Sequence, residues 1–506
     1  MRPASVLMIL LILGVAVRLG GAWIRSSDLT ADNDGYLAHA AMVANGEGFA
    51  GPYTHRPTAF RPPAYPIALA GLKASGLPDW ASVAIINGLS SIAIIWLSWI
   101  LCHQLQLPPS VSIMAATITA FDPLLVRYTI LPMTEVPAAA ILTGAVVLLK
   151  VADQRGKVSG DHGVRCRFIS GGLFGLGSLV RPILLVSCAM LVLSRLILNC
   201  KGGENSRRNV TMAILPMIAA AVAISPWIIR NAVQFRKFIP ATTHGGYTLA
   251  LGNNPDFYRD VIDGEGSFPW SGPQLDAWQQ RMIADAATQG VPVGDEPAQD
   301  AWYYQQAVSS MKAQPWSFFR SCLLRLRRFC AITPGSVDGL PRIATALIAV
   351  WYGLIWIGVA AAVGRSIPGL RSKRLEFDFT EKISAKRQMS ADGAADLRRR
   401  AAPSARARHG GEVIDAAEEI RLRAEPVPSG MPGLRSEKRI PPDQSLADLW
   451  LIVFSFMLLH SVYWTDTRMR APVMPLVCII AAVGWNSLFI FVSHRFHPQT
   501  SSERLT

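Results

Sequence analysis

The chain has 506 residues, of which 51% are apolar and only 17% are charged. Soluble domains carry charge on about a quarter of their residues, so this composition excludes an ordinary soluble protein and indicates a membrane protein. A formal net charge of +14 suggests nucleic acid as a partner when a chain is soluble. Here the excess basic residues lie in loops between apolar segments, as the positive-inside rule requires, so we expect no nucleic-acid partner.

The apolar segments predict about ten transmembrane helices, because a helix needs about 20 apolar residues to cross a bilayer. The first segment has the basic start and apolar run of a signal peptide but no small-x-small cleavage site, so we expect an uncleaved span. The segment at 168–180 is short for a full crossing. In chain order the predicted spans lie at 5–24, 83–102, 111–126, 136–151, 168–180, 183–198, 210–229, 343–363, 446–463 and 471–492.

Placing the N-terminus in the cytoplasm puts every short basic loop on the cytoplasmic side when the spans alternate. The same alternation puts two long polar loops, 25–80 and 230–341, outside. We therefore predict an all-α polytopic protein of the cytoplasmic (inner) membrane, surrounded by membrane lipids. Both its N- and C-termini are expected in the cytoplasm.

A basic segment at 365–445 interrupts this pattern of spans. It is poor in aromatic residues and rich in charge, so it cannot bury enough apolar surface to fold firmly, and we expect a largely disordered cytoplasmic insert. The insert divides the chain into a transmembrane region with both outer loops, at 1–364, and a C-terminal pair of spans with a tail, at 446–506.

The first outer loop holds two acids and an arginine beside the membrane: Asp32, Asp34 and Arg61. A carboxylate at this boundary can take a proton from an acceptor hydroxyl, and an arginine can hold a phosphate through two hydrogen bonds. Hydrolysis of a glycoside takes two carboxylates, but phosphate is already a good leaving group, so one base and one or two cations suffice. The loop predicts sugar transfer from a lipid phosphate, with Asp34 as first choice for the base and Asp32 as second.

Each of these residues also has a structural interpretation. Either aspartate could cap a helix that begins near Tyr36, and Arg61 could form a salt bridge with one of them instead of binding phosphate. Tyr65, which follows Arg61 in a proline-rich segment, is either a donor contact or an anchor at the membrane interface.

Neither a metal nor another cofactor is expected. The seven cysteines show no metal-binding spacing, which argues against a thiolate site. An Asp-x-Asp pair binds metal in enzymes that use nucleotide sugars, but such donors are not expected outside the cell.

Further polar residues lie at the predicted outer ends of spans. Glu135 is costly there unless it is paired, so it is either functional or bonded to a cation such as Arg127. Arginines at span ends often extend to the interface, and we interpret them as phosphate ligands only if they converge on one cavity. Four arginines have this position: Arg181, Arg230, Arg468 and Arg470.

The second outer loop begins with glycine and asparagine turns, at 245–246 and 252–255, which suit close approach of the backbone to a ligand. His244 and Asn253 are the candidate site residues there. Helices are expected at 274–289, 298–312 and 316–332. The last carries four arginines among aromatic residues and leucines, so it is either an amphipathic helix on the membrane or part of an acceptor site.

In this order and on these sides of the membrane, the motifs resemble those of the GT-C type membrane glycosyltransferases. The nearest group looks like the bacterial relatives of dolichyl-phosphate-mannose protein mannosyltransferases and of the aminoarabinose transferase that modifies lipid A. The resemblance implies a GT-C fold, a catalytic acid in the first outer loop, a polyprenyl-phosphate donor of a hexose or pentose, no metal, and inversion at the anomeric carbon. The motifs that carry it lie at 32–38, 46–49, 61–66, 134–135, 226–231, 244–247, 252–255 and 468–472.

A lipid-linked-sugar flippase or another polytopic transporter is the main alternative function. Transporters are expected to place their polar residues near the middle of the membrane on broken helices, whereas the candidates here lie mostly in outer loops. An inactive scaffold that keeps the fold is a third interpretation. The sequence leaves open the sugar and whether the acceptor is a protein, a lipid or a glycan.

Overall fold

A computed structural model describes residues 3–155, 160–199, 206–264, 270–333, 341–366 and 446–496. Within these ranges the regular structure is helical, apart from one isolated antiparallel bridge between Ala50 and Pro57, which confirms the predicted all-α class. Met1–Val363 and Pro442–Thr506 form one unit. The predicted insert at 365–445 lies outside the described residues, except for its first two positions.

Six helices of the described residues are long and apolar enough to cross a membrane, and a seventh span is added if the bent pair α5 (Pro109–Phe121) and α6 (Pro123–Thr129) counts as one. The chain is therefore a multi-pass membrane protein by the length and composition of its helices. The six helices are α1 (Pro3–Ile24), α4 (Asp79–Gln104), α7 (Glu135–Arg155), α10 (Ser206–Phe235), α16 (Arg342–Ser366) and α21 (Met474–Phe496), the last preceded by the short η4 (Thr467–Val473).

The expected total of about ten spans is not confirmed, although helices form at all the predicted positions. The first half of α8 (Gly160–Ser178) carries several charged residues. The apolar stretches of α9 (Ile183–Asn199) and α20 (Ala447–Val462) are shorter than a typical span. Helices α8, α9 and α20 are therefore not counted among the six membrane-spanning candidates, because they are too short or carry charge.

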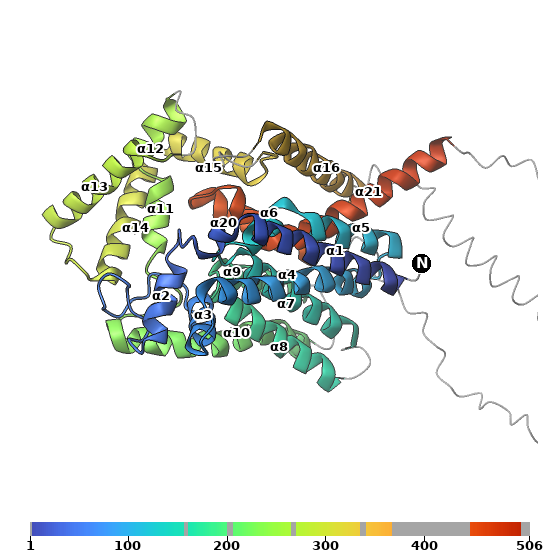
Figure 1. Cartoon of the computed structure of the whole chain (residues 1–506), viewed down its shortest axis with the longest axis horizontal. Coiled ribbons are helices and arrows are strands. Elements are labelled where there is room, and N and C mark those ends of the chain that lie inside the picture. The colour runs from blue at the N-terminus through green and yellow to red at the C-terminus, as the bar shows by residue number, and fades with distance from the viewer. Residues whose placement is uncertain are drawn as a thin grey trace, which may run out of the picture. The chain divides into compact units, whose positions relative to one another are not determined.

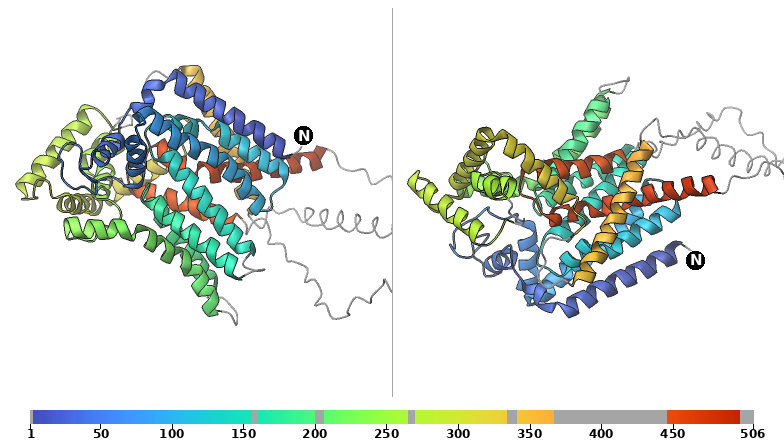
Figure 2. Two further views of the ribbon diagram at one scale, coloured as in Figure 1. Left: turned by 60° about the horizontal axis from the view of Figure 1, so that its bottom comes forward. Right: turned by 90° about the horizontal axis from the view of Figure 1, so that it is seen from above.

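Both long polar loops fold at the same end of the helix bundle, opposite the N-terminal end of α1 (Figure 1, Figure 2). The predicted helices of the second loop are confirmed within a few residues. The first loop forms η1 (Ser26–Thr30), α2 (Tyr36–Ala44) and α3 (Ala64–Ala74). The second forms α11 (Gly245–Gly252), α12 (Pro255–Phe257), η2 (Tyr258–Asp263), α13 (Pro273–Thr288), α14 (Glu296–Ala313) and α15 (Pro315–Phe329).

The predicted turn at Gly245 and Gly246 is wrong, because these residues begin α11. The Gly246 N–H donates to the Asp300 carboxylate at 2.6 Å, and a Cβ on Gly246 would lie 2.1 Å from the Asp300 carbonyl oxygen. The glycine is needed for the close approach of α11 to α14 and not for a turn.

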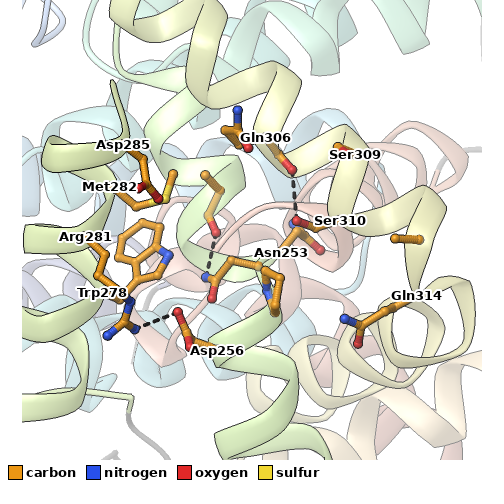
Figure 3. A pocket seen from close by; sticks show the side chains of 14 residues that line it. Asn253, Asp256, Trp278, Arg281, Met282, Asp285, Gln306, Ser309, Ser310 and Gln314 are labelled. Carbon is orange, nitrogen blue, oxygen red and sulfur yellow. Dashed lines mark hydrogen bonds and ion pairs between the residues drawn. The ribbon is translucent and has the colours of Figure 1, made fainter. Parts of the chain in front are cut away.

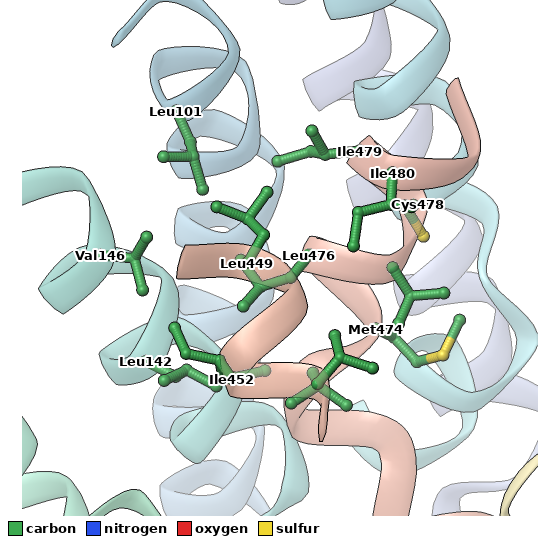
Figure 4. Packing of buried hydrophobic residues seen from close by; sticks show 14 of the residues in the cluster. Leu101, Leu142, Val146, Leu449, Ile452, Met474, Leu476, Cys478, Ile479 and Ile480 are labelled. Atoms are coloured by element: carbon green, nitrogen blue, oxygen red, sulfur yellow. The ribbon is translucent and has the colours of Figure 1, made fainter. Parts of the chain in front are cut away.

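The largest apolar core joins helices that are far apart in the sequence (Figure 4). Leu142 of α7 is fully buried in this cluster together with Leu449 of α20 and Leu476 of α21. The C-terminal helices therefore return to the centre of the bundle. They carry η4, which lies between them in the sequence, to the end of the bundle where α7 begins.

Helices α8 and α10 pack with their backbones close together. A Cβ on Gly171 would lie 2.2 Å from the Pro216 carbonyl oxygen, and one on Gly175 would lie 2.6 Å from the Ala220 carbonyl oxygen. Glycines spaced four apart allow two helix backbones to approach in this way. Gly172, on another face of α8, has nothing within 4 Å of its Cβ position.

Gly171→Ala should therefore destabilise the protein by about 1–3 kcal/mol, since the added methyl group must push α8 away from α10. Unfolding of the purified protein in detergent micelles by added SDS measures the loss. Gly172→Ala is the matched control and should leave the transition unchanged or slightly raise it. Equal effects of the two substitutions would contradict the close packing.

Candidate functional site

Asp34 lies where the first outer loop meets the C-terminal segment of the chain. One carboxylate oxygen is 3.6 Å from Nη2 of Arg61, and the other is 3.2 Å from Nη1 of Arg468. The Asp34 side chain is only 18% exposed. Two guanidinium groups, from the loop before α3 and from η4, therefore hold one partly buried carboxylate.

The charge state of Asp34 follows from these neighbours. Burial raises the pKa of the Asp34 carboxyl, but Arg468, Arg61 and Arg181 together lower it by more, so the pKa lies below its ordinary value. Asp34 is thus an ionised carboxylate at neutral pH. A carboxylate in this form only accepts hydrogen bonds and can take up a proton.

Asp32 has a different role, although it is only two residues away. Its carboxylate oxygens accept hydrogen bonds from the main-chain N–H groups of Leu37, at 3.0 Å, and Ala38, at 2.8 Å. These groups belong to the first turn of α2 and have no partner within the helix. The helix-cap interpretation therefore applies to Asp32, while Asp34 faces the arginines.

Glu135 and Arg181 form a second ion pair beside this cluster. A guanidinium nitrogen of Arg181 bonds the fully buried Glu135 carboxylate, and Nε of Arg181 donates to the Thr134 hydroxyl at 3.0 Å. Burial of Glu135 is tolerated because it is paired. The expected partner of Glu135, Arg127, is wrong, because Arg127 pairs with Asp28 instead.

His244 closes another side of the cluster with aromatic rings. Its ring centroid lies 4.2 Å from that of Phe60 and 5.3 Å from that of Tyr247. Burial, and then the charge of Arg61, lower the pKa of His244 to about 3, so the imidazole is neutral. Its Nδ1 has no hydrogen-bond partner among the described residues.

The Arg61 guanidinium is fixed by aromatic rings as well as by Asp34. It lies 5.3 Å from the centroid of Phe60 and 5.7 Å from that of Tyr36, distances at which a cation is attracted to a ring face. Phe60, Tyr36 and Tyr247 were missed by the sequence analysis. Phe60 could have been found from the sequence, because an aromatic residue directly before a candidate arginine can contact its guanidinium group.

Arg230 and Arg470 do not join the other two arginines. Arg230 donates to the carbonyl oxygens of Phe49 and Thr58, both at 2.7 Å. Arg470 donates to the carbonyl oxygen of Phe329 at 2.9 Å. These bonds tie chain segments together. Of the four span-end arginines, only Arg181 and Arg468 lie near Asp34, so the condition that all four converge is not met.

Tyr65 and Asn253 are also placed in the packed interior. The Tyr65 hydroxyl donates to Oδ1 of Asn87 at 3.1 Å. The Asn253 amide donates to the Val462 carbonyl oxygen at 2.8 Å and accepts from Arg325 at 3.0 Å. Both side chains are buried, so their described contacts are structural.

The described residues include no group of three or more His, Cys, Asp or Glu side chains placed to hold a metal ion. Asp32 and Asp34 turn to different partners, so the two acids do not converge on one point. The chemistry that this cluster can carry out is proton acceptance by one carboxylate next to cations suited to a phosphate.

No protein-family model and no curated protein matches this sequence. Among solved structures, the oligosaccharyltransferase of Archaeoglobus fulgidus tethered with an acceptor peptide has a TM-score of 0.49 and 13% identity, covering 98% of this chain and 51% of that one. The oligosaccharyltransferase AglB of Archaeoglobus fulgidus, in complex with an inhibitory peptide and a dolichol-phosphate, has a TM-score of 0.48 and 15% identity, with the same coverage.

ArnT from Cupriavidus metallidurans, bound to undecaprenyl phosphate, has a TM-score of 0.36 and 13% identity, covering 98% of this chain and 80% of that one. The chain spans about half the length of the archaeal oligosaccharyltransferase that it resembles. All three TM-scores lie below 0.5, so the function of this chain has to be inferred from its own residues.

Replacing Asp32 with alanine should weaken α2 by about 1 kcal/mol, because two N–H groups of its first turn lose their acceptor. Hydrogen exchange of the Leu37 and Ala38 amides should become about fivefold faster, which mass spectrometry of the purified protein measures. Asn33→Ala is the matched control, since the exposed Asn33 side chain lies between the two acids. Unchanged exchange in Asp32→Ala would contradict the capping role.

Proposed function

We propose that the chain is an inverting glycosyltransferase that moves a sugar from a polyprenyl-phosphate donor to an acceptor on the outer face of the cytoplasmic membrane, with both termini in the cytoplasm. The observation that carries the proposal is the Asp34 carboxylate held between Arg61 and Arg468. This arrangement combines a base with phosphate-binding groups at the end of the bundle where both outer loops fold. A lipid tail in the bilayer can bring its phosphate to this level.

In the proposed reaction, Asp34 takes the proton of the acceptor's nucleophilic group. The acceptor atom forms a bond to the anomeric carbon on the face opposite the phosphate, and the bond between that carbon and the phosphate oxygen breaks. The electron pair leaves with the phosphate. Inversion at the anomeric carbon follows, because one displacement occurs with one base and no covalent sugar–enzyme intermediate.

Arg61 and Arg468 have two partners in turn in this scheme. Without donor they neutralise Asp34, and with donor they turn toward the phosphodiester, whose single negative charge is spread over two free oxygens that accept hydrogen bonds. Negative charge builds up on this group as the polyprenyl phosphate leaves. The pKa of Asp34 then rises toward its ordinary value, since it loses cations and gains a neighbouring anion. Donor binding thus makes Asp34 a stronger base at the moment when a base is needed.

The neighbouring groups support this exchange. Arg181, held by Glu135 and Thr134, adds positive charge without having to release Asp34. The neutral His244 and the rings of Phe60 and Tyr247 cover one side of the cluster. A neutral, apolar wall strengthens the electrostatic interactions of the cluster because it excludes water.

Asp34→Asn should lower the rate of sugar transfer about 10²–10⁴-fold, because the amide cannot take up a proton. Purified full-length protein, radiolabelled polyprenyl-phosphate sugar and a membrane extract as acceptor source provide the assay. Asp32→Ala should keep most of its activity. Wild-type turnover in Asp34→Asn would remove this residue from the mechanism, and movement of the donor across vesicles without any transfer would favour a flippase.

The acidic limb of the kcat/KM profile reports the pKa of the free enzyme's base. Because that pKa lies below the ordinary aspartate value, wild-type activity should persist into mildly acidic pH and fall only at still lower pH. Arg468→Gln removes a cation, raises the pKa of Asp34 and should move the limb to higher pH. Arg127→Gln, which touches the Asp28 pair instead, should leave the limb in place. A limb unmoved by Arg468→Gln contradicts the assignment.

A further inference from the structure

A cavity of about 340 Å³ opens within the second outer loop, between α11, α12, α13 and α14 (Figure 3). None of its lining residues belongs to the Asp34 cluster. Small-molecule sites begin at about 300 Å³, and one or two sugar rings fit such a volume. The cavity is thus separate from the Asp34 cluster, and its lining residues indicate which kind of ligand it can bind.

The apolar part of the lining is rigid. Trp278 is only 1% exposed, and its ring packs 5.4 Å from that of Trp270 and 5.9 Å from that of Tyr247. Met282 and Pro255, which are more exposed than Trp278, supply the apolar surface that a ligand can contact. Sugar rings present C–H groups between their hydroxyls, so they need an apolar surface of this kind next to polar groups.

The polar part of the lining begins with one fixed carboxylate. Asp256 accepts hydrogen bonds from Arg281 at 2.7 Å and from Arg259 at 2.8 Å, one on each oxygen. Each carboxylate oxygen has a second acceptor position. Asp256 is therefore held in one orientation and can still accept a hydroxyl donor from a ligand.

Other polar side chains around the cavity are available to a ligand. Gln306, Gln314, Asp285 and Ser309 line it, and in the described part of the chain their side chains have no hydrogen-bond partner. The two amides supply both donors and acceptors, and the hydroxyl supplies one of each. A ligand with several neighbouring hydroxyls can use such mixed groups.

The charge of the lining selects the kind of ligand. Asp256 and Asp285 contribute two carboxylates, and Arg281 contributes one guanidinium, which is already bound to Asp256. This balance disfavours phosphates and other anions, which need free cations. The lining therefore favours a neutral ligand that carries many hydroxyl groups.

We propose that this cavity binds a neutral saccharide of one or two rings, as the recognition element of a glycan-containing acceptor. This identification of the acceptor rests on the proposed glycosyl transfer. Tyr247 connects the two places, since its ring contacts both His244 of the Asp34 cluster and Trp278 of the cavity. Gln279 of α13 also donates to the Tyr247 hydroxyl at 2.6 Å. One aromatic residue thus separates the cavity from the Asp34 cluster.

A glycan array that presents neutral, amino and acidic oligosaccharides, probed with the fluorescently labelled full-length protein in detergent, tests the proposal. We expect binding to at least one class of neutral glycans and none to the acidic ones. Gln306→Ala should weaken that binding about fivefold, as expected for a lost hydrogen bond. Gln305→Ala, an exposed neighbour of the same type that does not line the cavity, should bind like the wild type.

Ser309→Trp provides a second variant, because its large ring fills the cavity from an exposed position and should abolish binding. Asp34→Asn should bind glycans normally even though it does not transfer sugar, so failure of the saccharide site and failure of the proposed reaction are distinguished. Binding to no neutral glycan, binding to acidic glycans only, or equal binding by Gln306→Ala and Gln305→Ala would overturn the proposal.

Discussion

The central constraint of this molecule is a single carboxylate, Asp34, shared by two guanidinium groups at the end of the helix bundle where both long polar loops fold (Figure 1). Coulomb attraction of one such pair at 4 Å near a protein surface is about 4 kcal/mol before desolvation is counted. A partly buried aspartate therefore needs neighbouring cations. Arg468 is far from Asp34 in the sequence, so only the folded chain can bring the two together. The chain has to bring η4, which lies between α20 and α21, back to the first outer loop.

Two arginines that the sequence offered as candidate phosphate ligands instead hold the segments around Asp34 together. Arg230 ties α10 to the carbonyl groups of Phe49 and Thr58 in the first loop. Arg470 ties η4 to the end of α15 through Phe329. The helix cap by Asp32 holds α2 next to Asp34 in the same way. Hydrogen bonds from these side chains to main-chain groups fix the three segments that meet at the cluster, and they leave Arg61 and Arg468 to face the carboxylate.

The sequence was sufficient for features that depend on local composition. Apolar runs located the helices of the bundle, and the helices predicted in the second polar loop correspond to α13, α14 and α15. The sequence could not separate Asp32 from Asp34, because both precede the same helix and either could cap it. It paired Glu135 with Arg127, which is near in the chain, whereas the fold brings Arg181 to Glu135 and Asp28 to Arg127. Ten spans are not confirmed, because only six helices of the described residues, or seven with the bent pair, are long and apolar enough to cross a membrane. Helices α8, α9 and α20 form where spans were predicted, but their apolar stretches are shorter or interrupted by charge.

The most direct test of the account is an experimental structure of the protein with a bound polyprenyl phosphate, such as undecaprenyl phosphate, in lipid nanodiscs. The account predicts that the phosphate lies within hydrogen-bond distance of Arg468 and Arg61, that these side chains have turned away from Asp34, and that the Asp34 carboxylate faces an open acceptor position. A phosphate bound at another place, with Arg61 and Arg468 still on Asp34, would contradict it.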